Sequence, residues 1–426
     1  MARSFLTSAS CALCWMLSPD ALIMLGNSFG QSGLMFFVPF VIGVILSTLA
    51  IILTHHPALT ISTSSSFTQL ATSAGLLPAM TLTLASRLCL VLLLPTGMLV
   101  TAGFTFNETF IYWFPNFAFS FLLLGIILTL HLAGGRVALA AQPFFIGLTI
   151  CCLVLLCLAG LLGPQELPPT ETEPGNQFSL TVPLIFTSLL LFLGYDQPEF
   201  SPSSNSRAYY TWTLIAGFII LAFWGFVSLK HVPQATLANS TIPYIISARE
   251  ILGQPGRSIM GIAVISGTCG VVNGLFLLAS RSLQQMADHV YLPSVGNPAL
   301  RQRIWPVIFS LFIGIFMAVG LAGSENLEIY IYGALLFWLL LIGMHCFTAV
   351  RDLQKQKRTS TRYWYLLSTV FPLAAVWLAC INVHAVTLVV FCSLVLGISA
   401  TLSAGWFWYD RKIHNKAIQN SQGELP

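Results

Sequence analysis

Two acidic residues lie inside apolar segments of this chain, each beside a residue that breaks helices. The first segment reads Cys14-Trp-Met-Leu-Ser-Pro-Asp20, and the sixth reads Phe192-Leu-Gly-Tyr-Asp196 with Pro198 two positions later. Because proline removes a backbone donor and clashes with the preceding turn, both segments are expected to hold an interrupted helix. Backbone groups freed at such a break, together with the acid, can bind an ion or a polar solute.

The two interruptions and one buried amide give the candidate residues for a central solute site. They are Ser18, Pro19, Asp20, Ala21, Gly194, Tyr195, Asp196 and Asn273. Simpler roles stay open for several of them: a proline often only kinks a membrane helix, an aromatic ring packs, and an asparagine bonds a neighbouring helix. Asp20 and Ser280 are the candidates for a coupling-ion site.

Composition indicates lipid as the main solvent. Of 426 residues, 56% are hydrophobic and 8% are charged, whereas soluble domains are about 25% charged. A net charge of +4 spread over short loops makes nucleic acid an unexpected partner. We therefore expect a single transmembrane domain in a lipid bilayer, with the ten cysteines serving mainly as small apolar residues.

Twelve apolar runs are long enough to span a bilayer as helices. They centre near residues 17, 43, 94, 125, 150, 190, 220, 269, 313, 339, 372 and 397. Placing both termini in the cytoplasm puts all but three of the 18 basic residues on that side, the exceptions being Lys230, Arg249 and Arg257. Because positive residues favour the cytoplasmic side, the chain is predicted to be a multi-pass protein of the plasma (inner) membrane with both termini inside.

Two motifs resemble those of a known family, the amino acid–polyamine–organocation (APC) superfamily of secondary transporters. The Phe192–Asp196 stretch is similar to its F-x-G-[FY]-[DE] motif. The eighth span resembles a second pattern through Asn273, Ser280-Arg281, Met286-Ala-Asp288 and Leu292-Pro293. The resemblance covers nearly the whole chain.

The resemblance implies an all-α protein of about twelve transmembrane helices with a LeuT-type 5+5 inverted repeat and discontinuous first and sixth spans. The first repeat would occupy residues 1–165 and the second 176–350, followed by two additional helices at 360–410 and a cytoplasmic tail at 411–426. It also implies amino acid permease-like transport by alternating access around a central site.

Two departures from the family pattern bear on the solute. Ser18-Pro19-Asp20 stands where relatives carry G-[SA]-G and hold a substrate carboxylate, which Asp20 would repel. The fifth span has no lysine of the kind that some proton-linked members keep. These departures favour an amine or other organic cation over a zwitterionic amino acid, and leave the coupling ion open between H⁺ and Na⁺.

The expected function is a secondary active transporter that moves a small amine-containing solute: an organic cation, a polyamine or an amino acid. A channel, or a transporter-like membrane sensor without transport, is the alternative. The chain is not expected to be an enzyme, because it has no H-E-x-x-H motif or paired Ser–His arrangement. No cofactor or fixed metal is expected, and the sequence leaves the oligomeric state open.

Overall fold

The computed structural model describes residues 2–54, 66–163, 177–194, 206–289, 298–321, 325–355, 362–382 and 384–423. Within these ranges every regular element is a helix. Helices are what apolar sequences form in lipid, because each segment then satisfies its own backbone hydrogen bonds. The all-α prediction is confirmed for this part of the chain.

The helices of the first half run from the N-terminus to residue 191. They are α1 (Ala2–Leu13), α2 (Pro19–Ser32), the short 3₁₀ helix η1 (Gly33–Phe36), α3 (Phe37–Thr54), α4 (Ser66–Ala74), α5 (Leu76–Thr109), α6 (Asn116–Ala133), α7 (Gly135–Leu162) and α8 (Gln177–Leu191).

The second half continues with further long helices and one short helix. They are α9 (Ser206–His231), α10 (Gln234–Asn239), α11 (Pro243–His289), α12 (Pro298–Ala318), α13 (Glu325–Lys355), α14 (Arg362–Ile381) and α15 (Ala385–Gly423). Gly253 interrupts α11 with a positive φ of 63°, so this element consists of two helices joined at a kink.

A helix lies at every predicted span centre except the first, which falls in the gap between α1 and α2. In the described part of the chain, nine helical segments are long and apolar enough to cross a membrane. Two shorter apolar helices, Val182–Leu191 and Arg303–Ala318, occupy the sixth and ninth predicted positions. The chain is therefore a multi-pass membrane protein.

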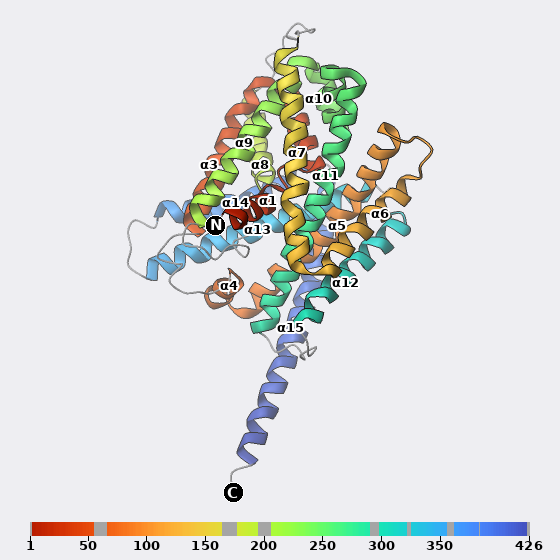
Figure 1. The fold of residues 1–426 in the computed structure, drawn as a ribbon. Helices are drawn as coiled ribbons and strands as arrows, with labels where there is room; N and C mark the ends of the chain where they lie inside the picture. The colour runs from red at the N-terminus through yellow and green to blue at the C-terminus, as the bar shows by residue number, and fades with distance from the viewer. Residues whose placement is uncertain are drawn as a thin grey trace.

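Helix α11 forms the centre of the bundle. In the apolar window of Pro243–Ala287, 89% of residues are buried, against 11% for Ala385–Tyr409 of α15. Figure 1 shows α11 and α7 within the bundle, while the last turns of α15 extend away from it. The short helices α10 and α4 lie at opposite ends of the bundle. The central position of α11 places its residues against the first break, between α1 and α2.

Candidate functional site

The first break lies between Leu13 and Pro19, as the sequence predicted. Ser18 begins α2 as its N-cap in an extended conformation, and its hydroxyl accepts a hydrogen bond from Ala21 N at 3.0 Å. Pro19 occupies the first helical position, where its missing N–H costs nothing. Ser18, Pro19 and Ala21 are all buried, so this helix start lies in the protein interior.

Asp20 lies in the first turn of α2, where the helix dipole favours a negative charge. Its Oδ2 atom is buried and has no hydrogen-bond partner in the described structure. Glu328 of α13 is close enough for its charge to act on Asp20, and Asp20 in turn acts on Tyr244 of α11. The carboxylate thus lies where three helices converge.

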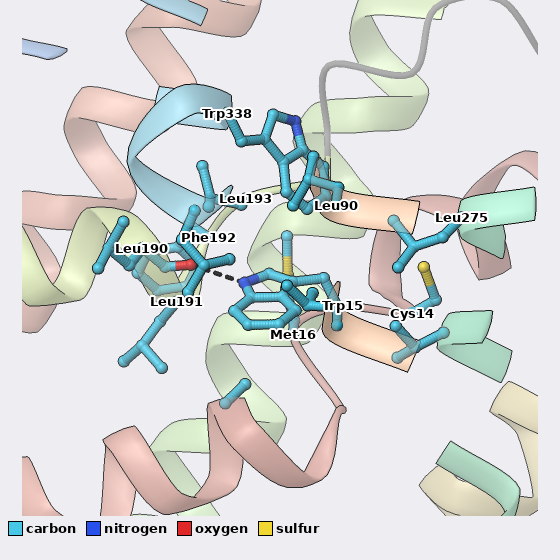
Figure 2. Packing of buried hydrophobic residues seen from close by; sticks show 14 of the residues in the cluster. Cys14, Trp15, Met16, Leu90, Leu190, Leu191, Phe192, Leu193, Leu275 and Trp338 are labelled. Carbon is cyan, nitrogen blue, oxygen red and sulfur yellow. Dashed lines mark hydrogen bonds between the residues drawn. The ribbon is translucent and has the colours of Figure 1, made fainter. Parts of the chain in front are cut away.

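The second break begins where α8 ends at Leu191, and it packs against the first. The Trp15 indole N–H donates to the carbonyl of Leu190 at 2.7 Å, as Figure 2 shows. Gly194 has a positive φ of 101°, and a Cβ there would lie 3.0 Å from the Ala12 carbonyl oxygen. Glycine is therefore needed at residue 194 both for its backbone conformation and for this close approach.

Tyr195 and Asp196 lie outside the described residues. Their predicted roles in the central cavity stay predictions. Gly194, directly before them, is described and lies against Ala12 and Trp15. The described part of the second break therefore adjoins the first, which is the arrangement expected for a site between two interrupted helices.

Asn273 is fully buried and joins α11 to α7. Its amide donates to the Ala138 carbonyl at 2.9 Å and to Gln142 Oε1 at 2.6 Å. Gln142 donates back to the Gly270 carbonyl at 2.9 Å, and His131 of α6 lies beside Asn273. This network favours the interhelical role for Asn273; a contact with solute stays a prediction.

Ser280 lies away from Asp20 along α11. A Cβ at Gly267 would lie 3.0 Å from the Leu17 carbonyl oxygen, which fixes the level of the break on this helix. Ser280 is 13 residues further on, or about 20 Å along the axis at 1.5 Å per residue. The structure therefore does not bring Ser280 and Asp20 together, and an ion role for Ser280 remains a prediction on its own.

Three residues that the sequence did not single out lie near the breaks. Arg87 of α5 is buried, with its guanidinium 5.9 Å from the centre of the Trp338 ring, and Trp338 packs on Trp15 at 6.3 Å. Tyr244 and Glu328 are the neighbours of Asp20. A lone arginine within the apolar run at 76–109 was the available signal for Arg87, since charged residues at membrane depth are usually functional.

Comparison with known proteins gives a fold. No family model matches this chain. Crystal structures of the Eremococcus coleocola manganese transporter resemble it over 96% of this chain and 94% of theirs, at 11% identity. A point mutant of that transporter gives a TM-score of 0.59, and its complex with an aromatic bis-isothiourea substituted compound gives 0.56.

One curated relative matches part of the chain. It is a lycopene elongase/hydratase of Haloferax volcanii, 28% identical over 180 residues, covering 37% of this chain and 57% of that enzyme. The match spans little more than half of the enzyme's length, so it does not carry the enzyme's activity to this chain. The structural neighbours are transporters.

These comparisons correct two predictions. The resemblance to the APC superfamily is wrong, because the matching structures are those of a manganese transporter. The amine or amino acid cargo, and with it the amine partner, is wrong for the same reason. Short motifs built from small and apolar residues recur in membrane helices, so the two matched motifs carried little specificity. The chain thus has a LeuT-type fold that resembles a metal-ion transporter.

Proposed function

We propose that this chain is a secondary transporter that moves a small inorganic cation across the membrane by alternating access, with Asp20 as its principal ligand. A divalent metal ion, Mn²⁺ first, is the proposed cargo. The observation that carries the proposal is the buried Asp20 Oδ2, which lies at a helix break and has no hydrogen-bond partner in the described structure. A buried carboxylate without compensation is costly, so the site favours a positive ligand.

Close packing around the first break supports a cargo of ionic size. A Cβ at Gly267 would lie 3.0 Å from the Leu17 carbonyl oxygen, and one at Gly274 would lie 2.9 Å from Cys14 Sγ. Gly194 approaches Ala12 equally closely on another side. The segment between α1 and α2 is therefore enclosed by backbone and small side chains, which leaves little room there for an organic solute.

The available donors support a hard cation. The break presents the Asp20 carboxylate and the carbonyl groups of an irregular segment, all of them oxygen donors. No group of three or more His, Cys, Asp or Glu side chains able to hold a metal ion occurs among the described residues. A cation here would complete its shell with backbone oxygens and water, as Mn²⁺ and Mg²⁺ do more readily than Zn²⁺ or Cu²⁺. Incomplete side-chain ligation also suits a cargo that must be released.

The proposal extends to the architecture. Twelve spans, inverted repeats at 1–165 and 176–350, two additional helices and cytoplasmic termini agree with the helix at or beside every predicted centre. The plasma (inner) membrane is the proposed location. H⁺ or Na⁺ would be the coupling ion, and Asp20 is the residue at which either could compete with the cargo.

Uptake of radioactive Mn²⁺ into proteoliposomes, with and without an imposed H⁺ or Na⁺ gradient, tests the function. We expect saturable uptake by the wild-type protein. Asp20→Asn keeps the size of the side chain and removes its charge, and should lower uptake at least tenfold. Glu250→Gln is the matched control, because Glu250 is an exposed acid of α11 and its neutralisation should leave uptake unchanged.

The same preparation separates the alternatives. Single-channel currents with no saturation would identify a channel, and the absence of cation uptake under every gradient would reject the transport proposal. Normal Mn²⁺ uptake by Asp20→Asn would remove Asp20 from the mechanism, even if transport itself were established.

A further inference from the structure

A second buried oxygen without a partner lies near Asp20. Tyr244, the second residue of α11, is 1% exposed, and its hydroxyl makes no hydrogen bond within the described structure. Buried hydroxyl groups almost always have a partner, because leaving one unpaired in a protein interior is unfavourable. An unpaired phenol in the bundle therefore indicates a ligand or a bound water.

Packing fixes the start of α11 against α2. A Cβ at Gly26 would lie 2.6 Å from Pro243 Cγ, so the two helices approach too closely there for any larger residue. The Asn27 amide, in the orientation that satisfies both of its polar atoms, donates to the Leu237 and Ser240 carbonyls at 2.8 and 3.0 Å. Tyr244 is thus held beside the helix whose first turn carries Asp20.

The hydroxyl of Tyr244 and the carboxylate of Asp20 share one environment. The charge of Asp20 acts on Tyr244, yet no hydrogen bond joins them, and an oxygen of each is buried without a partner in the described structure. A hydroxyl and a carboxylate that lie near each other would normally pair directly. A small ion or a water between them would satisfy both groups at once.

We propose that the Tyr244 hydroxyl is the second side-chain oxygen of the Asp20 cation site, contacting the ion directly or through one bound water. This inference rests on the proposed function, and it names a ligand from α11 for a site otherwise built on α2. Other polar groups nearby are engaged or exposed: Ser18 caps Ala21 N, Glu108 pairs with Arg257 at 3.4 Å, and Glu328 is exposed.

Tyr244→Phe removes only the hydroxyl and tests the inference in the purified full-length protein. Mn²⁺ alone is the probe, with its Kd measured by titration calorimetry and thermal unfolding followed with and without the ion. We expect Kd to rise about tenfold, as for other lost polar partners of metal sites. The Mn²⁺-free Tm should stay equal or rise, because the variant no longer buries an unpaired hydroxyl.

Ser403→Ala is the matched control. Ser403, on α15, is fully buried and its hydroxyl also lacks a partner in the described structure, so its removal should leave the Mn²⁺ affinity unchanged. An unchanged Kd in Tyr244→Phe, with binding lost in Asp20→Asn, would overturn the Tyr244 inference and leave the proposed function standing. A fall in the Mn²⁺-free Tm without a change in Kd would give Tyr244 a structural role instead. Failure of the wild-type protein to bind Mn²⁺ would overturn both.

Discussion

Trp15 joins the two helix breaks, and its replacement by phenylalanine is expected to impair transport more than folding. The indole N–H donates to the Leu190 carbonyl at 2.7 Å, across 175 positions of sequence. Phenylalanine keeps most of the ring but cannot donate, so the buried Leu190 carbonyl would lose this hydrogen bond. Contact with Trp338, at 6.3 Å between ring centres, would be largely retained.

The size of the effect follows from the energy of one buried hydrogen bond. Removing one partner and leaving the other unsatisfied costs about 1–3 kcal/mol. If the hydrogen bond is present in one transport conformation and absent from the other, the same energy shifts their populations about 5- to 150-fold. We therefore expect Trp15→Phe to lower the Mn²⁺ uptake rate at least fivefold, while Tm falls by only a few degrees.

Trp377→Phe provides the control for Trp15→Phe. Trp377 of α14 is 46% exposed and contacts Phe186 through its ring, so this variant should transport normally. Uptake and thermal unfolding would be measured in the same detergent and lipid. Equal uptake by Trp15→Phe and the wild-type protein would show that the Trp15–Leu190 hydrogen bond does not distinguish transport states. That result would refute the reasoning.

Two further predictions concern stability. Lys230 donates to the carbonyls of Gly160, Leu161 and Gly163 at 3.0, 3.1 and 2.9 Å, so Lys230→Met should lower the free energy of unfolding by about 1–3 kcal/mol; Lys355→Met, at a largely exposed amine, should change Tm little. A Cβ at Gly30 would lie 2.2 Å from Ala238 N, so Gly30→Ala should lower Tm by overpacking, whereas Gly147→Ala, with nothing within 4 Å, should leave Tm unchanged or raised. Thermal unfolding checks both pairs, and a control that falls as far as its test variant would contradict either argument.

Local sequence signals predicted the helices and the first break well. Each apolar run of about 20 residues must satisfy its own backbone in lipid, so helix positions follow from hydropathy alone. The first break follows from Pro19 after Ser18, because that pair caps a helix and cannot continue one from the previous turn. Neither inference needs knowledge of what the segment packs against.

The composition of the site could not be predicted in the same way. Tyr244 is 224 positions from Asp20, and Glu328 is further still, so only the packing of α2, α11 and α13 brings them together. Asn273 looked like a solute ligand because an amide in an apolar run needs a partner, but that partner proved to be Gln142 of a neighbouring helix. The cargo was misjudged because short motifs were taken to identify a family, whereas the fold was matched only in three dimensions.

Arg87 shows how one buried charge can belong to the support of a site. The basic-residue count placed it on the cytoplasmic side; the structure buries it within α5, and without it 14 basic residues still oppose three, so the orientation argument stands. Arg87 contacts Trp338, and Trp338 contacts Trp15, whose indole bonds the end of α8. The guanidinium therefore reaches the first break through two aromatic rings, not by direct contact with its backbone. A cation–π contact in a desolvated setting is worth about 2 kcal/mol, enough to hold Trp338 and hence Trp15 in one orientation. The arginine, the two tryptophans and the Leu190 carbonyl thus form one connected support, which links α5 and α13 to both interrupted helices.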